Sequence, residues 1–465
     1  MLFSGGELKD ATGGATVRRS DRPVTCVTVD SRTVAEGALF VPLAGERVNG
    51  HAYIGEALSR GASAVLVESL ERAGNAALKE TLAAAENVTI VEVANTLSAL
   101  QDLARYHMAR YPHVVRIGIT GSSGKTTTKE LVGSIFSLFA PTAVSKGNLN
   151  SEIGVPLSAF QVTQGDEYAV FEMGINHPGE MDILASIVKP NAALITNIGT
   201  AHIGLLGSRE AIAAEKKKIA SFFTDDDVLF LFEEDEFLSF LQDGIHGTVL
   251  TYGPRSTQGF TGSRILGLDG TAIDWEGLRI RFPLVGPHNL VNALGAISLA
   301  AYCRIPEALI KEGLERVSQP DGRSEILRGR IDLINDSYNA NPDSVIRALR
   351  FLAETQARGR RIAVLGDMRE LGEQREVLHR ELGREAGQLA VDGYFFYGEG
   401  MEAAYQALAQ TSFRGRAFHT TDFSALTTEV CADVRPGDLV LLKGSRAMEL
   451  ERLVGPLMNE SGRGA

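Results

Sequence analysis

The segment "GITGSSGKTTTKE" (118–130) has the residue types of a loop that holds phosphate groups. Gly121 and Gly124 permit a tight backbone close to a ligand, and successive backbone N–H groups before a helix attract phosphate oxygens. Lys125 supplies a positive charge for the β- and γ-phosphates of a nucleotide, and Thr126 supplies a hydroxyl for Mg²⁺. A glycine-rich turn before a helix would look similar, but strand and helix patterns on its two sides favour nucleotide binding. The loop residues concerned are Gly121, Ser122, Ser123, Gly124, Lys125, Thr126 and Thr127.

Two further side chains lie where neighbouring strands are expected to end. Glu172 is near the end of the apolar segment 168–174, and His202 follows the apolar segment 192–199. In an open parallel sheet, ligands bind outside the carboxyl ends of the strands, so both side chains should reach the same rim as the phosphate loop. Taken alone, Glu172 would be a solvated strand end and His202 a hydrogen-bonded loop histidine. Beside a phosphate loop, a carboxylate and an imidazole indicate metal ligands.

Three consecutive lysines, Lys216, Lys217 and Lys218, lie in the segment 208–223, which has helical periodicity. A solvated helix face is the ordinary interpretation of such a run. Helix geometry separates the three, because at about 100° per residue only Lys216 falls on the apolar face. The apolar side chains of that face are Ile212, Ile219 and Phe223. A free ammonium buried there would be costly, so Lys216 needs a charge partner, a depressed pKa or a chemical modification.

Polar side chains crowd the end of another expected strand, in the segment "INDSYNANPDS" (334–344). The aspartate ends the strand, a position that often holds a nucleotide ribose. Turn chemistry explains the Asn-Pro pair by itself. It does not explain why an aspartate, a tyrosine and two further asparagines gather at one strand end. The residues concerned are Asp336, Tyr338, Asn339 and Asn341.

Two asparagines in "GPHNLVNALGA" (286–296) lie one helical turn apart. At this spacing Asn289 and Asn292 face the same way on a helix. A capped helix start is the ordinary interpretation, and recognition of a base edge by the two amides is the functional one. The residues alone leave both interpretations open.

Alternating strand and helix patterns divide the chain into three blocks, which agrees with roughly 150 residues per domain. The expected domains are residues 1–93, 94–319 and 320–465. Strands that alternate with helices indicate parallel sheets covered on both faces. We therefore expect an α/β protein of three domains, whose central domain carries the phosphate loop on a mostly parallel sheet.

The composition is typical of a globular protein, with 44% hydrophobic and 22% charged residues among 465. A net charge of −12 argues against nucleic acid or an anionic membrane surface as partner. No apolar run approaches the roughly 18 residues of a membrane span, and the first residues do not resemble a signal peptide. The three cysteines, Cys26, Cys303 and Cys431, are far apart, so no disulfide framework is expected. These features fit a cytoplasmic protein.

Eight motifs, in order from Thr120 to Glu451, resemble those of the Mur ligase family. They are "TGSSGKTTTKE", "FEMGINHPGE", "NIGTAHIGLLGS", "GPHNLVNALGA", "DGRSEI", "NDSYNANPDS", "LGDMRELGE" and "LLKGSRAMELE". The N-terminal "VDSRTVAEGALFVPLAGERVNGH" is similar to the UDP-binding domain of that family. The resemblance implies a UDP-binding N-terminal domain, a central ATPase domain and a Rossmann-like C-terminal domain. It also implies ATP and Mg²⁺, the latter in two sites, as requirements.

The segment "YNANP" resembles the member of the family that joins D-alanyl-D-alanine to UDP-N-acetylmuramoyl-tripeptide. The implied reaction is ATP-dependent amide formation through an acyl phosphate, in peptidoglycan precursor synthesis. The tripeptide's carboxylate takes the γ-phosphoryl group, and the amine of the dipeptide then attacks. We expect these two substrates as partners and a monomeric enzyme, whereas the third residue of the stem peptide stays open.

The resemblance assigns roles by position. The implied catalytic residues are Lys125, Glu172, His202 and Lys216. The implied metal ligands are Thr126, Glu172, His202 and a carbamylated Lys216. The implied adenine contacts are Asn289 and Asn292. Arg323 and Asp336 match residues that reach the nucleotide when the C-terminal domain closes. Substrate contacts fall to Ser31 and Arg32 on the UDP side, and to Tyr338, Asn339 and Asn341 near the dipeptide.

Two departures from the family pattern concern the substrate side and not the core chemistry. Lys218 stands where the family usually has an acidic residue, and Asn49-Gly50-His51 stands where it often has Asp-Gly-His. Three rival functions share some of these features: a folylpolyglutamate synthase of the same superfamily, a phosphotransferase or motor NTPase, and a nucleotide-binding scaffold without catalysis. The "YNANP" segment argues against the first. The complete set of metal-ligand types argues against the last.

Overall fold

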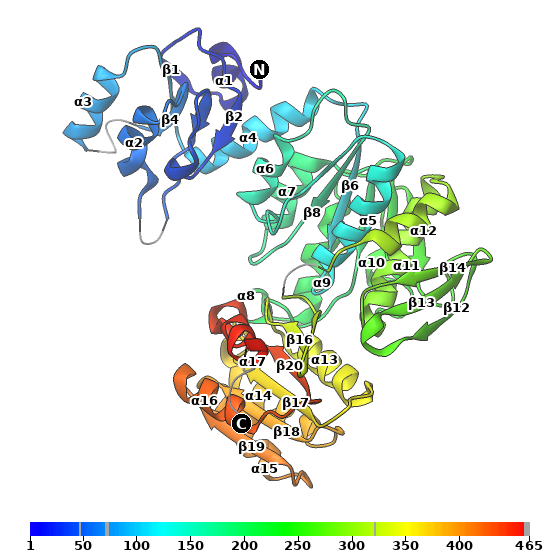
Figure 1. Ribbon diagram of the computed structural model, residues 1–465. Helices are drawn as coiled ribbons and strands as arrows, with labels where there is room; N and C mark the ends of the chain where they lie inside the picture. The colour runs from blue at the N-terminus through cyan, green and yellow to red at the C-terminus, as the bar shows by residue number, and fades with distance from the viewer. Residues whose placement is uncertain (46–47, 70–73, 320–321, 460–465) are drawn as a thin grey trace.

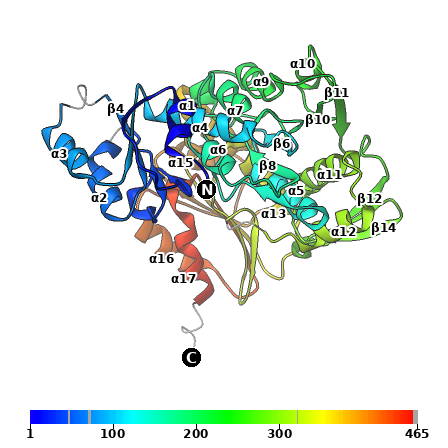
Figure 2. The same ribbon diagram turned by 90° about the horizontal axis from the view of Figure 1, so that it is seen from above.

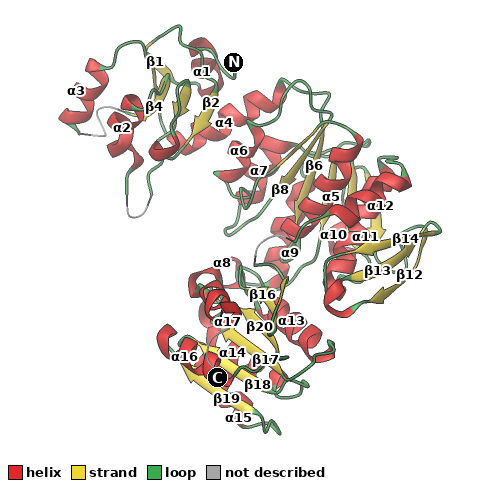
Figure 3. Ribbon diagram, viewed as in Figure 1, coloured by secondary structure: helices red, strands yellow, loops and turns green. Residues whose placement is uncertain are grey.

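A computed structural model describes residues 1–45, 48–69, 74–319 and 322–459. The chain forms three α/β domains that follow one another from the upper left to the bottom of Figure 1, and each has strands flanked by helices (Figure 3). The expectation of a three-domain α/β fold is confirmed. The proposed boundary after residue 93 stays a prediction, and the one at 319/320 falls at residues outside the described part.

The N-terminal domain is a five-stranded sheet of order β1-β5-β4-β3-β2, in which β1 runs antiparallel to β5 and the other pairs are parallel. Its strands are β1 (Ala15–Arg18), β2 (Cys26–Thr28), β3 (Ala38–Phe40), β4 (Ala64–Glu68) and β5 (Thr89–Val93). Its helices are α1 (Gly5–Thr12), α2 (Ile54–Ser59) and α3 (Ala76–Ala84). Helix α4 (Thr96–Ala109) leads into the central domain and packs against α1 on one side and α6 and α7 on the other.

The central domain is a six-stranded sheet of order β11-β10-β9-β6-β8-β7, in which every pair is parallel. Its strands are β6 (Val115–Thr120), β7 (Thr142–Val144), β8 (Tyr168–Glu172), β9 (Ala192–Ile195), β10 (Val228–Phe232) and β11 (Thr248–Tyr252). Its helices are α5 (Lys125–Phe139), α6 (Gly154–Ala159), α7 (Glu180–Val188), α8 (Ile203–Leu206), α9 (Arg209–Lys217), α10 (Leu238–Gln242), α11 (Pro287–Tyr302) and α12 (Glu307–Arg316). Strands such as β10 ("VLFLF") are apolar along their length because helices cover both faces.

A small antiparallel sheet was not foreseen from the sequence. It consists of β12 (Phe260–Ile265), β13 (Thr271–Trp275) and β14 (Leu278–Phe282). In Figures 1 and 2 it lies at the side of the molecule away from the N-terminal domain. Buried Trp275 and Phe282 join the core that this sheet shares with α5, α11 and α12.

The C-terminal domain is a second six-stranded sheet, of order β15-β16-β20-β17-β18-β19, in which only the edge strand β15 is antiparallel. Its strands are β15 (Glu325–Arg328), β16 (Asp332–Asp336), β17 (Arg361–Gly366), β18 (Gly393–Tyr397), β19 (Arg416–Thr420) and β20 (Leu439–Lys443). Its helices are α13 (Pro342–Glu354), α14 (Arg375–Ala386), α15 (Met401–Ala409), α16 (Phe423–Asp433) and α17 (Val454–Asn459). Within the described ranges, no helix has the length and apolar character needed to cross a membrane.

Candidate active site

Three adjacent strands of the central sheet bring the predicted residues to one rim. Strand β6 lies between β8 and β9, so their carboxyl ends are neighbours. The phosphate loop follows β6, Glu172 ends β8, and His202 comes seven residues after the end of β9. Glu172, His202 and the loop residues from Ser122 to Thr127 line one cavity of about 380 Å³.

Two glycines allow the phosphate loop to take its shape. Gly121 has a φ of +147°, and a Cβ there would lie 1.8 Å from Thr196 Oγ1. Gly124 has a φ of +82° at the N-cap of α5, and a Cβ there would lie 2.6 Å from Asn292 Oδ1. Any larger residue would therefore push the loop away from its neighbours. The loop places the N-terminus of α5, with its unpaired N–H groups, at the cavity.

The polar groups of the loop are tied to the segment after β9. Gly199 N donates to Ser122 Oγ at 2.8 Å, and Ser123 N donates to Asn197 Oδ1 at 3.2 Å. Lys125 Nζ folds back and donates to Gly121 O at 2.8 Å. Burial lowers the pKa of Lys125, and the charge of Glu172 acts in the opposite direction.

The hydroxyl of Thr126 and the carboxylate of Glu172 lie together on the wall of the cavity. Thr126 Oγ1 donates to Glu172 Oε2 at 2.7 Å, and Asn150 Nδ2 donates to Glu172 Oε1 at 2.7 Å. Glu172 is 1% exposed, so these donors compensate a buried charge. Among the described residues no three His, Cys, Asp or Glu side chains form a metal-binding group. A cation here would therefore draw other oxygens from hydroxyl, phosphate and water, as Mg²⁺ commonly does.

His202 connects the central and C-terminal domains. Its backbone is left-handed, with φ 62°, and its Nδ1 lies 2.6 Å from Glu370 Oε2 of the C-terminal domain. The hydrogen bond with His202 holds the pKa of Glu370 below its usual value. Beside this pair, Gly204 N donates to Glu370 O at 3.0 Å.

Lys216 is the buried member of the lysine run, as predicted. It is 0% exposed, and its Nζ has no hydrogen-bond partner among the described residues. Burial, assisted by the charge of Lys125, lowers the pKa of Lys216 well below its ordinary value. By contrast, Lys217 Nζ donates to Phe240 O, and Lys218 pairs with Asp182 and Glu215. The helix is shorter than expected, because α9 ends at Lys217 and a 3₁₀ turn follows. Lys216 does not line the cavity itself.

Asn289 and Asn292 of α11 lie on the same side of the cavity as the phosphate loop, with Asn292 next to Gly124. Asn292 Nδ2 donates to Asn289 Oδ1 at 3.1 Å, and Asn289 Nδ2 donates to Val285 O at 2.8 Å. Both line the cavity and are nearly buried. Their neighbour His288 also lines it, and burial lowers the pKa of His288 to about 4. Its Nδ1 has no partner within the described part of the chain.

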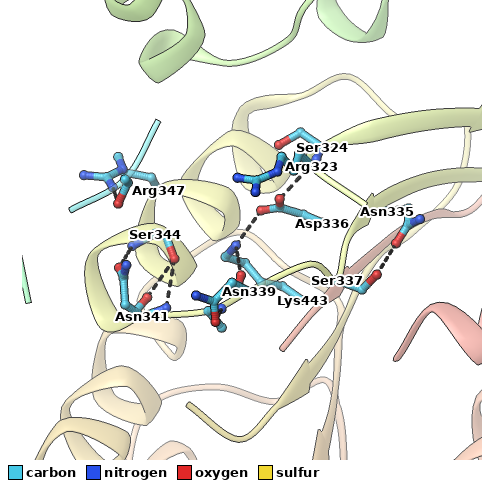
Figure 4. Close-up of polar contacts among 12 residues, drawn as sticks. Arg323, Ser324, Asn335, Asp336, Ser337, Asn339, Asn341, Ser344, Arg347 and Lys443 are labelled. Carbon is cyan, nitrogen blue, oxygen red and sulfur yellow. Dashed lines mark hydrogen bonds and ion pairs between the residues drawn. The ribbon is translucent and has the colours of Figure 1, made fainter. Parts of the chain in front are cut away.

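The C-terminal domain forms the opposite wall, shown in Figure 4. Asp336 and Lys443 end the adjacent strands β16 and β20, and Lys443 Nζ lies 2.6 Å from Asp336 Oδ2. The guanidinium of Arg323 lies 3.9 Å from the ring centroid of Tyr338. The two expected closure residues, Arg323 and Asp336, line the cavity, and so does Tyr338, which is expected near the dipeptide. Their roles stay predictions. Lys443 lines the cavity too and was missed, although its place at a strand end was a usable signal.

A second cavity of about 330 Å³ adjoins the first. The two share five lining residues: Asn148, His202, Tyr338, Asn339 and Asn341. Asn341 also caps α13, since its Oδ1 accepts from Ser344 N at 2.9 Å. Arg369 and Arg446 line only the second cavity.

The predicted UDP-side residues are not part of either cavity. Ser31 Oγ donates to Glu56 Oε2 at 2.8 Å, and Arg32 pairs with Asp30 at 2.7 Å in the N-terminal domain. Their proposed contact with a uridine nucleotide stays a prediction. Of the two departures from the family pattern, Lys218 pairs with two acidic residues, and Asn49 caps a 3₁₀ turn by accepting from His51 N.

Three family models match this chain in succession. "Mur ligase family, catalytic domain" matches residues 23–108, "Mur ligase middle domain" matches 119–300, and "Mur ligase, glutamate ligase domain" matches 322–446. A curated protein of Treponema pallidum is 40% identical over 99% of this chain and 100% of its own length. The chain therefore belongs to the Mur ligase family, which confirms the resemblance seen in its motifs.

The individual relatives carry one name. The Treponema pallidum protein is named UDP-N-acetylmuramoyl-tripeptide–D-alanyl-D-alanine ligase, as is a Bacillus subtilis protein that is 34% identical over 93% of each chain. Among solved structures, MurF from Acinetobacter baumannii matches with a TM-score of 0.87 and 29% identity, covering 98% of this chain and 99% of that one. MurF from Thermotoga maritima in complex with ADP matches with a TM-score of 0.80 and 25% identity, covering 94% and 98%.

Proposed function

We propose that this chain is an ATP-dependent ligase that joins D-alanyl-D-alanine to UDP-N-acetylmuramoyl-tripeptide in peptidoglycan precursor synthesis. The observation that carries this proposal is the junction of two cavities between the domains. The larger contains the phosphate loop, and the smaller shares His202, Asn339 and Asn341 with it. A phosphorylated carboxylate in one and an amine in the other would meet at these shared residues. The relatives' names and the ADP-bound structure support the same activity.

The proposed chemistry has two steps. A carboxylate oxygen of the tripeptide attacks the γ-phosphorus of ATP, the bond to the β,γ-bridging oxygen breaks, and ADP leaves. The amine of D-alanyl-D-alanine then attacks the carbonyl carbon of the acyl phosphate. The bond from that carbon to the phosphate oxygen breaks, inorganic phosphate leaves, and the nitrogen loses a proton to give the amide. Because water would also attack an acyl phosphate, a site lined by two domains, which can exclude water when they close, suits this reaction.

The phosphate loop and the C-terminal wall of the cavity would contact different parts of ATP. The N–H groups of the loop and Lys125 would hold the β- and γ-phosphates, which lowers the cost of gathering negative charge there. Asn289 and Asn292 would contact the base, and Asp336 and Arg323 would contact the nucleotide from the C-terminal side. Ser122, Ser123 and Thr127 complete the loop around the phosphates.

The donor set on the cavity wall fits Mg²⁺. In this proposal Thr126, Glu172 and His202 would hold the ion, because a hydroxyl and a carboxylate already lie 2.7 Å apart beside the phosphate loop. When bound, Mg²⁺ neutralises charge on the phosphoryl group being transferred. Asn150 holds the second carboxylate oxygen of Glu172 and so fixes its orientation.

Lys216 would carry a carbamate that helps to hold a second Mg²⁺. Its amine is buried and has no partner among the described residues, and its lowered pKa favours the neutral, nucleophilic form. The nitrogen lone pair would attack the carbon of CO₂ and the nitrogen would lose a proton, which leaves an anionic carboxylate. This change replaces a buried amine by an anion close to Lys125, whose positive charge disfavours a cation at Lys216 and favours an anion there.

The second cavity would hold the acceptor dipeptide. Tyr338, Asn339 and Asn341 line it, and the guanidinium of Arg369 has no carboxylate partner among the described residues. Arg369 would therefore pair with the dipeptide carboxylate, leaving the amine near His202. Ser31 and Arg32 would contact the uridine nucleotide in the N-terminal domain. The enzyme would act as a monomer in the cytoplasm, where ATP is available.

One assay tests the proposal. Purified protein, ATP and Mg²⁺ are mixed with UDP-N-acetylmuramoyl-tripeptide, with and without D-alanyl-D-alanine, and phosphate and peptide product are measured. Stoichiometric phosphate and pentapeptide product that require both substrates are expected. Phosphate release that is independent of the dipeptide would instead favour an NTPase or phosphotransferase, and release with folate and glutamate a folylpolyglutamate synthase.

A further inference from the structure

Arg347 extends from the C-terminal domain to the phosphate loop of the central domain. It lies on the second turn of α13, and its Nη2 donates to Ser123 Oγ at 3.1 Å. The two residues are 224 positions apart in the sequence. Arg347 is half-buried and lines the larger cavity together with Asn292 and His288. In Figure 4 it lies to the left of Arg323, Asp336 and Lys443.

No carboxylate among the described residues pairs with the Arg347 guanidinium. The two acidic side chains that influence it electrostatically are Asp343 and Asp336, and both are engaged elsewhere. Asp343 Oδ2 accepts from Thr200 N and from Thr200 Oγ1, each at 2.8 Å. Asp336 accepts from Ser324 N and Lys443 Nζ. A half-buried cation with five donors thus has one neutral hydroxyl as its hydrogen-bond partner among the described residues, and burial lowers the pKa of Arg347.

We propose that Arg347 binds the phosphates of the nucleotide, as a second cationic side chain that the C-terminal domain brings to the phosphate loop alongside Arg323. A guanidinium matches phosphate oxygens in a forked geometry, and its attraction to an anion is strong in a cavity with little water. The position against Ser123, one residue before Gly124, puts that fork beside the loop that holds the phosphates. The inference rests on the proposed function only in taking ATP as the ligand.

A purely structural role is the main alternative. Helix α13 is also fastened to the central domain through Asp343 and Thr200, and Asp343 does not line the cavity. If Arg347 only holds the two domains together, its replacement should change nucleotide affinity in the same way as the replacement of Asp343. If Arg347 binds phosphate, its replacement should weaken the binding of nucleotides more when they carry more phosphates. The binding of adenosine should not change.

The test is titration calorimetry of the full chain with three probes: a non-hydrolysable ATP analogue, ADP and adenosine, in Mg²⁺ buffer. The variants are Arg347→Met, which keeps the aliphatic stem, Asp343→Asn, and Arg350→Met as the matched control. Arg350 lies on the same helix, is 60% exposed and pairs with Glu385 at the surface. We expect Arg347→Met to raise the Kd of the ATP analogue roughly tenfold to a hundredfold and the Kd of adenosine by less than about twofold. Arg350→Met should bind all three like the wild type.

Three outcomes would overturn the inference: unchanged affinity for the ATP analogue in Arg347→Met, an equal loss for adenosine, or the same pattern of losses in Asp343→Asn. Circular dichroism and the thermal midpoint establish that each variant is folded. Because the titration needs neither tripeptide nor dipeptide, it stays informative if the ligase assay fails. A wild type that binds ATP without ligating the dipeptide would refute the proposed function and leave the Arg347 inference intact.

Discussion

Thr126 and Glu172 are in direct contact at the centre of the site: Thr126 Oγ1 donates to Glu172 Oε2 at 2.7 Å. One residue is in the first turn of α5 and the other ends β8, so the contact joins the phosphate loop to a neighbouring strand. A hydroxyl and a carboxylate held together in this way offer oxygens of the kind that Mg²⁺ prefers, as the proposed function requires.

Glu172→Gln should lower ligase activity by about 100-fold or more and raise the Mg²⁺ concentration needed for half-maximal activity, because it removes the negative charge from a proposed ligand. The measurement is product formation over a Mg²⁺ titration. Glu130→Gln is the matched control, since Glu130 lies on α5 with a side chain 40% exposed. An unchanged Mg²⁺ dependence in Glu172→Gln would exclude Glu172 as a ligand.

Lys216→Ala should lose far more activity than Lys217→Ala, although each change removes one lysine side chain from the same helix. The reason is that only Lys216 is buried without a partner, whereas Lys217 bonds to a surface carbonyl. If a carbamate is the working group, Lys216→Arg should stay inactive and acetate should partly restore Lys216→Ala. A ¹³C NMR carbamate signal in ¹³CO₂-equilibrated wild type, absent from Lys216→Ala, checks the modification itself. Equal activities of the two alanine variants would contradict the prediction.

Gly204→Ala should disturb the docking of the C-terminal domain. A Cβ at Gly204 would lie 2.3 Å from Gly372 N and 2.7 Å from Glu370 O, both backbone atoms of that domain. Because backbone does not yield as a flexible side chain does, we expect the domains to separate and turnover to fall. Small-angle scattering should show a larger radius of gyration with ATP analogue and UDP-tripeptide than the wild type has. Gly262→Ala, with nothing within 4 Å, is the control and should match the wild type.

Arg369→Ala should raise the KM for D-alanyl-D-alanine by roughly tenfold and leave the KM for ATP unchanged, because Arg369 lines only the second cavity. Steady-state kinetics with each substrate varied in turn make the comparison. Arg380→Ala serves as the control, since Arg380 is an exposed arginine paired with Glu376. A rise in the KM for ATP alone would show that the two cavities have been assigned to the wrong substrates.

His288 should make the protein less stable as the pH falls below neutrality. Burial lowers its pKa from 6.5 to about 4, so the unfolded chain takes up a proton first as the pH drops through 6.5. The resulting loss in the free energy of unfolding is absent above pH 7 and reaches about 2 kcal/mol by pH 5. His288→Gln should remove it. Urea unfolding of the wild type and of His288→Gln at pH 7.5 and pH 5 gives the free energy of unfolding of each. If the wild type and the variant differ by the same free energy at both pH values, the prediction is refuted.

Several site residues can be predicted from the sequence because local geometry determines where they lie. The carboxyl ends of parallel strands meet at one edge, which predicts that Glu172, His202 and the phosphate loop lie together. The angle of about 100° per residue singled out Lys216 among three lysines, even though α9 ends sooner than expected. The β12–β14 sheet escaped notice because its short hairpins interrupt a pattern of alternating strands and helices.

The α/β class, the phosphate loop and the inward position of Lys216 can be predicted from the sequence, because each follows from periodicity or spacing over a few residues. Which distant side chains meet depends instead on how strands and domains pack. Asp336 and Lys443, 107 residues apart, pair because β16 and β20 are adjacent in the sheet. Arg347 reaches Ser123 because the C-terminal domain docks on the central one. Such contacts depend on strand order and domain packing, which no local pattern encodes.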